Sequence, residues 1–445
     1  MSHKKKAITS MGALVGVQIL NYILPLIAIP VIVRIIGPEK FGIINYVSSI
    51  TSYLILLIGF SFELSASRVI AMNQDDHEKL NSIFNKVFFA KAFLFAASVV
   101  IYTAIFFSSE TLQQDKPVAI FSFLICIAYI FDCNYLYLAK QDLKQTAMFN
   151  LITKVALNLC LLIFIREKGD YIYQPLIISL AQIVVGVGAF FWAIRRYTLS
   201  ITFPGLKAVW DIIWRDKILF FHSFAHTVYT TLNIIMLGYF KGITEVGFYS
   251  AGWKLIILIQ ALLISPLGMV LFPIIGQAFG KSKEEGIAIV QKMLPVVFFS
   301  TLIIAVGILT VGGVFINIFY GAKFLESVVI FKILAFMPMM LALNMLFGIQ
   351  TMVNLKMDKY FFSITLSAAF LNILLNLVLI HFWGSEGAAI SWFITETYCA
   401  VAMYALIKRR KIELLNLKYF SFSIVKATLE PIVSKFKERI KKSAA

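Results

Sequence analysis

The sequence predicts an all-α polytopic membrane protein with about twelve transmembrane helices in two parallel six-helix bundles. Of the 445 residues, 60% are hydrophobic and 14% are charged, and the mean hydropathy is +0.87. A soluble globular protein is about 45–50% apolar and about 25% charged. Apolar runs cover the chain from Ile8 to Ile407 without a polar stretch of domain size. At about 20 residues for each crossing, this length accommodates about twelve helices.

The loops are expected where charged residues, Gly and Pro cluster. With a cytoplasmic N-terminus, the inner loops carry about twice as many Lys and Arg residues as the outer loops, which satisfies the positive-inside rule. Both termini are therefore predicted to be cytoplasmic. The predicted spans are 8–34, 41–70, 83–108, 117–138, 145–165, 172–194, 217–240, 246–278, 287–317, 325–352, 359–382 and 387–407.

The longest inner connection, Tyr197 to Asp216, separates six predicted spans from six. Trp210 and Trp214 lie in it beside Arg215, a pattern typical of a short amphipathic helix on the membrane surface. In the C-terminal tail, apolar residues recur at helical spacing among lysines, which fits a helix on anionic membrane lipids or a solvated tail. The predicted domains are an N-terminal bundle (1–197), a cytoplasmic amphipathic linker (198–216), a C-terminal bundle (217–410) and a basic cytoplasmic tail (411–445).

Two short sequence matches relate the halves. Each match pairs a span with the sixth span after it, which indicates parallel halves related by an axis along the membrane normal. Gly37, Phe41 and Gly42 recur as Gly242, Val246 and Gly247, and Asn158, Leu159, Leu161 and Gly169 recur as Asn376, Leu377, Leu379 and Gly387.

Composition and motifs exclude several classes. The net charge of +17 lies in tails and loops, so the expected partner is an anionic membrane surface and not nucleic acid. The nearest match to a phosphate-binding loop, Gly276 to Ser282, has three residues between its glycines instead of four, so no ATPase is expected. The four cysteines lie in apolar runs, and no metal site, cofactor site or catalytic constellation stands out. The chain is therefore not expected to be an enzyme.

Ionisable residues inside the spans are the candidate functional residues. A charge at mid-bilayer costs at least about 2.5–3.5 kcal/mol, so such residues normally face a bundle interior or a water-filled cavity. The alternative for each lysine is that it snorkels to the interface or pairs with a carboxylate. A cationic cavity indicates an anionic substrate. The candidate substrate-binding residues are Lys154, Lys254, Lys91 and Lys332, with Arg68 at the inner mouth and Arg34 in the first outer loop.

Three carboxylates are candidates for ion coupling. Glu63 and Asp132 lie near the inner ends of their spans, and Glu396 lies deep in the last span. A lone carboxylate in the membrane can titrate during transport, and the alternative is a salt bridge or a hydrogen bond to a neighbouring helix. Pro266 and Pro338 interrupt spans, as kinked helices of transporters often do.

Particular strings between residues 10 and 410 carry a family resemblance. They are Asn21-Tyr22-Ile23-Leu24-Pro25, Val33 through Gly42, Gly59-Phe60 with Leu64 through Arg68, Gly247-Phe248-Tyr249 through Pro266, Phe272-Pro273, and Gly387 through Ile390 with Thr395-Glu396. These strings resemble the O-antigen and capsule repeat-unit flippases, the Wzx-type branch of the multidrug/oligosaccharidyl-lipid/polysaccharide exporter superfamily. Glu63 departs from the pattern, because the family motif often has a neutral amide there.

The resemblance implies a MATE-like fold whose two six-helix bundles open a cavity alternately to either leaflet of the bacterial plasma membrane. It implies that the cargo is an oligosaccharide on undecaprenyl pyrophosphate, moved to the outer leaflet for O-antigen or capsule synthesis. A polysaccharide polymerase and a chain-length regulator are the protein partners it implies. The alternatives are a flippase for another polyprenyl-linked precursor of the peptidoglycan or teichoic acid type, a cation-coupled small-molecule exporter, and a non-transporting scaffold.

Overall fold

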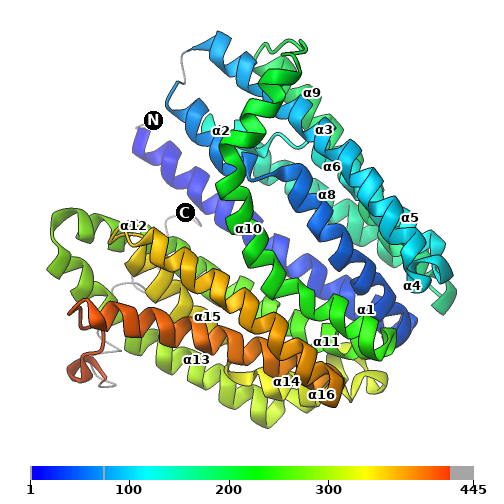
Figure 1. Cartoon of the computed structure of the whole chain (residues 1–445), viewed down its shortest axis with the longest axis vertical. Helices are drawn as coiled ribbons and strands as arrows, with labels where there is room; N and C mark the ends of the chain where they lie inside the picture. Colours follow the sequence, from blue (N-terminus) through cyan, green and yellow to red (C-terminus); the bar gives the residue numbers. More distant parts are fainter. Residues whose placement is uncertain (1–2, 74–75, 421–445) are drawn as a thin grey trace. The chain divides into compact units, whose positions relative to one another are not determined.

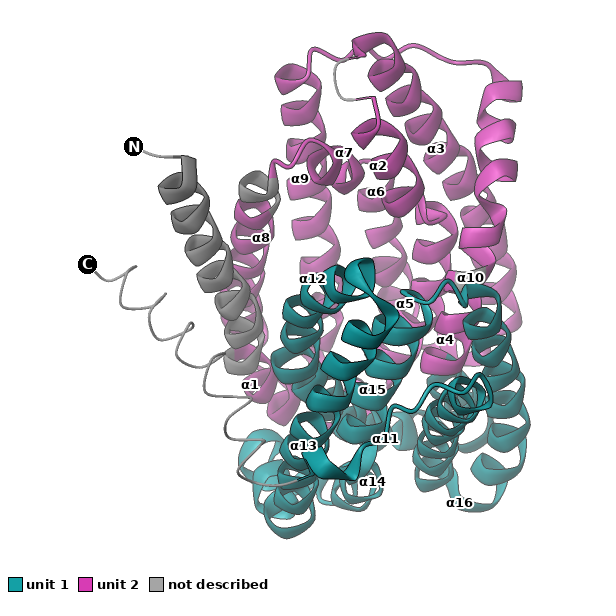
Figure 2. Ribbon diagram, turned by 90° about the vertical axis from the view of Figure 1, so that its left-hand side faces the viewer, with its two compact units in different colours: residues 1–12, 232–445 teal, residues 13–231 magenta. Residues whose placement is uncertain are grey.

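Every regular element in the part of the chain that the structure describes is helical (Figure 1). The structure is a computed structural model that describes residues 3–73 and 76–420, with the backbone alone for 3–27, 143–146 and 222. The predicted all-α fold class is confirmed. The chain divides into two compact units, which are unit 2 (residues 13–231) and unit 1 (residues 1–12 and 232–445) (Figure 2). Most of the predicted basic tail, residues 421–445, lies outside the described residues.

The helices of the N-terminal half follow the predicted spans. α3 begins at a side-chain cap, because Asp76 accepts a hydrogen bond from the Lys79 N–H at 2.9 Å, and this bond holds the pKa of the Asp76 carboxyl below its ordinary value. The elements are α1 (His3–Gly59), α2 (Phe62–Ala71), α3 (His77–Ser108), α4 (Glu110–Gln114), α5 (Lys116–Phe123), α6 (Ile125–Ile130), α7 (Asn134–Ala139), α8 (Leu143–Phe164), the 3-10 helix η1 (Lys168–Ile172) and α9 (Tyr173–Arg196).

Helix α10 (Leu206–Lys241) runs from unit 2 into unit 1, since the division falls between residues 231 and 232. The residues expected to form a separate amphipathic helix are its first turns. Trp210 and Trp214 stack there with ring centroids 6.5 Å apart, and both are exposed. The predicted surface helix is therefore continuous with a span, while the predicted domain boundaries stay a prediction.

The C-terminal half contains long helices and two π-helical segments. A π-helix has the wider i to i+5 hydrogen-bond pattern and is often found at functional sites. The elements are α11 (Ile243–Ile259), the π-helix η2 (Gln260–Ile264), α12 (Ser265–Lys281), α13 (Lys283–Tyr320), η3 (Ala322–Phe324), α14 (Ser327–Ile333), η4 (Leu334–Phe336), α15 (Met337–Asn344), the π-helix η5 (Met345–Met352), α16 (Asp358–Arg409) and η6 (Leu417–Tyr419).

All twelve predicted spans coincide with helical segments. Nine of the described segments are long and apolar enough to cross a membrane. The difference in number has a simple origin, because α16 holds two predicted spans on either side of a bend at Gly384, and α1 holds the first predicted span and most of the second around a bend at Gly37. α10, which is not among the nine, contains the seventh predicted span.

Two glycines support the internal repeat. Gly37 has φ 75° and ψ 175°, and its predicted counterpart Gly242 has φ 93° and ψ 173°. This region of backbone conformation is almost restricted to glycine. The same unusual bend thus follows the first span of each half. The second match has no such support, because Gly169 has no positive φ and Gly387 instead allows a close approach to the Leu379 backbone.

Each unit has its own apolar core. In unit 2, the rings of Phe84 and Phe88 from α3, Phe131 after α6 and Phe190 from α9 pack with centroids between 5.0 and 6.3 Å apart. In unit 1, the core joins α12, α13, α15, η5 and α16. These cores position the polar side chains described below.

The two glycine bends predict a stability effect. Gly37→Ala and Gly242→Ala should each lower the free energy of unfolding by about 1–3 kcal/mol, because alanine is strained in this conformation. A clash is not the reason, since an added Cβ at either position meets no atom within 4 Å. Thermal unfolding of the purified protein in detergent measures the effect. Gly59→Ala is the matched control, because that helical position also has open space, and an equal loss there would contradict the interpretation.

Candidate functional site

The predicted span 117–138 is interrupted, and a charged pair lies at the break between α6 and α7. The Nζ of Lys91, on α3, donates to the main-chain oxygen of Asp132 at 2.7 Å and to its Oδ2 at 3.3 Å. Asp132 Oδ1 accepts a hydrogen bond from the N–H of Asn134, at the start of α7, at 3.2 Å. The break leaves a backbone carbonyl after α6 and a backbone N–H at the start of α7 without helical partners. The charged pair supplies their hydrogen bonds, which lipid cannot do.

The two members of this pair differ in burial. Its side chain is 3% exposed, against 28% for Asp132, and its ammonium lies 5.5 Å from the centroid of the Tyr135 ring. Lys91 is thus more buried than expected from its distance to the span ends. The alternative that the sequence left open, a lysine paired with a carboxylate, is what the structure shows.

A second break brings Glu63 to the same region. Phe60 and Ser61 have positive φ values of 43° and 59°, and α2 begins after them and packs against α7 (Figure 2). Glu63, in the first turn of α2, is exposed and interacts electrostatically with Asp132 and Lys91. Three of the candidate ionisable residues of unit 2 therefore gather where two spans are interrupted.

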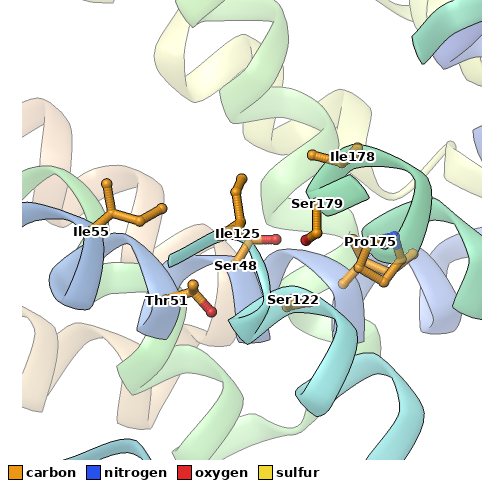
Figure 3. A pocket seen from close by; sticks show the side chains of 9 residues that line it. Ser48, Thr51, Ile55, Ser122, Ile125, Pro175, Ile178 and Ser179 are labelled. Carbon is orange, nitrogen blue, oxygen red and sulfur yellow. The ribbon is translucent and has the colours of Figure 1, made fainter. Parts of the chain in front are cut away.

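Unit 2 also contains a small pocket between α1, α5, α6 and α9 (Figure 3). Its volume is about 80 Å³, and its lining is mostly apolar, with Ser48, Thr51, Ser122 and Ser179 among isoleucine and proline side chains. The Ser122 hydroxyl is buried and has no hydrogen-bond partner. Sites for drug-sized ligands are about 300–1,000 Å³, so this pocket fits about two water molecules and not a sugar.

In unit 1, Glu396 on α16 is 3% exposed and is held by Asn344, the last residue of α15. The Asn344 Nδ2 donates to Glu396 Oε2 at 2.6 Å and to the Glu396 main-chain oxygen at 3.1 Å. The expected alternative of a hydrogen bond to a neighbouring helix is therefore observed. Within the described residues, no Lys or Arg forms an ion pair with this carboxylate.

A network of buried asparagines lies in the same unit. Asn376 donates to the Oδ1 of Asn233 at 2.6 Å and to the Oδ1 of Asn372 at 2.8 Å, and all three residues are fully buried. Asn372 donates to the Thr395 hydroxyl at 3.1 Å, and Asn233 donates to the Tyr249 hydroxyl at 3.3 Å. These uncharged groups join α10, α11 and α16.

The remaining predicted cations differ in burial. Lys154 on α8 and Lys254 on α11 are half-buried, whereas Lys332 on α14, Arg34 on α1 and Arg68 on α2 are exposed. Both half-buried lysines lie in apolar helices, one in each unit. The two units are described separately, so a common cationic cavity stays a prediction.

Sequence reasoning missed the polar residues that hold these sites together. Asn344 and the asparagine network were not among the candidates, although Asn372 and Asn376 stand one helical turn apart in an apolar span. Uncharged amides at i and i+4 in such a span are the signal that could have found them, because a buried amide requires partners.

Comparisons with known proteins agree with this fold. A putative O-antigen transporter of Escherichia coli K12 is 26% identical over 401 residues, which are 89% of this chain and 95% of that protein. The solved structure of the lipid II flippase MurJ in an inward closed conformation has a TM-score of 0.73, 13% identity and coverage of 96% and 92%. An inward-facing MATE multidrug transporter has a TM-score of 0.68, 14% identity and coverage of 88% and 94%.

These similarities define a multi-pass membrane protein with the fold of the MATE and MurJ transporters. The model of the family described as polysaccharide biosynthesis protein matches residues 8–279, and the chain belongs to that family. The resemblance to polysaccharide flippases is thereby confirmed. Because its relatives are transporters and flippases, its classification as a transporter and not an enzyme is also confirmed.

The charged pair at the α6–α7 break predicts strong coupling. Asp132→Asn should lower the free energy of unfolding by about 2–3 kcal/mol, less than for a fully buried pair, because it leaves Lys91 without its counter-ion. Lys91→Met combined with Asp132→Asn should cost less than the sum of the single changes. Unfolding of the four proteins in detergent completes the double-mutant cycle, and additive losses would show that the pair is not coupled.

Proposed function

We propose that this protein flips an oligosaccharide linked to undecaprenyl pyrophosphate from the inner to the outer leaflet of the bacterial plasma membrane, for O-antigen or capsule synthesis. The observation that carries the proposal is the match to a putative O-antigen transporter along nearly the whole of both chains. The family assignment supports it independently.

The cargo combines two chemistries that the chain must handle. A pyrophosphate is an anion, and lysine ammonium groups bind phosphate oxygens through charge-assisted hydrogen bonds. Lys154 and Lys254 are proposed to supply this contact, because they are half-buried in apolar helices while Lys332, Arg34 and Arg68 are exposed. Lys91 is committed to Asp132 and is not proposed to bind the cargo.

Transport is proposed to proceed by alternating access with an ion gradient as the energy source. Glu396 is the leading coupling residue, since it is buried and has no cationic partner among the described residues. Glu63 and Asp132 are secondary candidates in unit 2. A polysaccharide polymerase and a chain-length regulator are the proposed partners downstream, and anionic lipids are proposed to contact the basic cytoplasmic side.

A second candidate function is a flippase for another polyprenyl-linked precursor, such as one of the peptidoglycan type. The fold similarity to a lipid II flippase supports it, and its cargo would carry the same pyrophosphate. Rescue of a lipid II flippase-deficient strain, without rescue of an O-antigen flippase-deficient strain, would favour this candidate.

Complementation of an O-antigen or capsule flippase-deficient strain tests the proposal. The wild-type chain should restore surface polysaccharide, and Lys154→Ala or Lys254→Ala should reduce it by about tenfold or more, because a hydrogen bond to a charged group is lost. Membrane expression is matched by immunoblot. Lys281→Ala is the control, since that side chain is 73% exposed at the end of α12, and it should behave as wild type.

Two results would count against the proposal. If wild type fails to restore polysaccharide in strains with several different repeat units, the proposed cargo class is wrong. If wild type succeeds and both lysine variants succeed equally, the cationic contact is wrong while the flippase function stands.

A further inference from the structure

The buried carboxyl group of Glu396 has no cationic partner among the described residues. An ionised carboxylate is costly to bury unless a cation or several hydrogen-bond donors compensate it. Glu396 is 3% exposed, the Asn344 amide donates to its carboxylate, and the Trp392 side chain, one helical turn earlier on α16, also interacts with it. Two neutral groups are a weak substitute for a counter-ion, so the site can accept a positive charge in another form.

The second atom of the same amide indicates which form that is. The Asn344 Oδ1 is buried and has no hydrogen-bond partner. If the amide rotates by half a turn, Oδ1 replaces Nδ2 in front of Glu396 Oε2. An oxygen there repels a carboxylate but accepts a hydrogen bond from a protonated carboxyl group. The rotation therefore gives the unpaired oxygen a partner when Glu396 takes up a proton, while Nδ2 gives up both of its hydrogen bonds to Glu396.

The arrangement suits a proton better than a metal ion. Rotation of the Asn344 amide would place only one further oxygen beside the carboxylate, whereas Ca²⁺ takes about 6–8 oxygen ligands and Mg²⁺ prefers an octahedral set. Within the described residues, no group of three His, Cys, Asp or Glu side chains is placed to hold a metal.

The elements that pack against α16 offer few competing charges. α15, η4 and η5 carry no ionisable side chain, and on α16 itself Cys399 interacts electrostatically with Glu396. The ionisable residues on the other neighbours in unit 1 are Glu245, Tyr249 and Lys254 on α11, Lys332 on α14, and Tyr239 and Lys241 on α10, which is joined to α16 by the Asn233–Asn376 hydrogen bond. Within the described residues, none of these six forms an ion pair with Glu396 or a hydrogen bond to its carboxylate.

Asn344 also stands at a mechanical junction, because the π-helix η5 begins at the next residue. In η5, Gln350 donates to the Gly268 main-chain oxygen on α12 at 3.1 Å, and its Oε1 is buried without a partner. α12 follows the π-helix η2, and Pro266 in the first turn of α12 lacks the N–H that a regular helix would use. When the Asn344 amide rotates, it loses its bond to the Glu396 main-chain oxygen, so the start of η5 is held less firmly.

We propose that Glu396 and Asn344 form a proton-binding site in which the Asn344 amide rotates when Glu396 is protonated, and that this rotation releases η5 from α16. The proposal rests on the proposed function in one respect, since it identifies the ion that drives transport as a proton. The segment that moves in response is η5, the π-helical part of the tenth predicted span.

Hydrogen–deuterium exchange on the full purified chain in lipid nanodiscs tests the proposal without any cargo. After correction for the intrinsic exchange rates with unstructured peptides, the amides of Met345–Met352 should exchange about tenfold faster at acidic than at alkaline pH, as expected for the loss of a hydrogen bond to a charged group. Glu396→Gln should abolish this pH dependence, because the variant has no proton to bind. Asn344→Leu should exchange fast at both pH values.

The control is Glu245→Gln, which removes the carboxylate of the same unit that accepts from the Ser385 N–H near the bend in α16. It should keep the wild-type pH dependence in η5. The proposal is overturned if wild-type η5 shows no corrected pH dependence, or if Glu396→Gln retains it. Because exchange needs no cargo, a failure here leaves the complementation result intact, and a failure of complementation leaves the proton site intact.

Discussion

The Lys91–Asp132 pair is the interaction on which the architecture of unit 2 depends. A transmembrane helix can be interrupted only if something other than lipid satisfies the freed backbone groups. Here the ammonium of Lys91 donates a hydrogen bond to the Asp132 carbonyl, and the Asp132 carboxylate accepts one from the Asn134 amide. The same contacts fix α3 against the broken span, which places Phe84 and Phe88 on Phe131 and Phe190. The aromatic core and the position of Glu63 both follow from this arrangement.

In unit 1, the buried polar contacts between helices are made by neutral groups. Its buried polar connection consists of asparagine amides and hydroxyls, whose partners are mostly one another. Such a network carries no net charge, so neither pH nor the membrane potential changes its energy to first order. Glu396 is adjacent to Thr395 of this network, yet it is ionisable, and its carboxylate accepts a hydrogen bond from the Asn344 amide. The uncharged asparagine network and the titratable Glu396–Asn344 contact therefore involve neighbouring residues of α16.

Much of the fold follows from the sequence, because lipid imposes a simple rule on every span. Runs of apolar residues placed all twelve helical segments, and the match between Gly37 and Gly242 pointed to two positions that share an unusual backbone conformation. The sites were harder to predict, because distance from the end of a span does not reveal which face a side chain occupies. Lys91 is paired and buried although it is nearer to a span end than Lys154, and Lys332 is exposed. Asn344 was missed because its partner is 52 residues away and an uncharged amide barely alters the hydropathy of a span.

The Lys91–Asp132 pair also has a consequence for how the protein is made. Asp132 follows Lys91 by 41 residues in the chain, so the span that contains Lys91 emerges from the ribosome before the span that contains Asp132. During that interval a lysine in the bilayer carries an insertion penalty of about 2.5–3.5 kcal/mol. The apolar side chains of the rest of the span offset this penalty. The third and fourth spans are therefore coupled during biogenesis, because the lysine of the third gains its counter-ion when the fourth packs beside it.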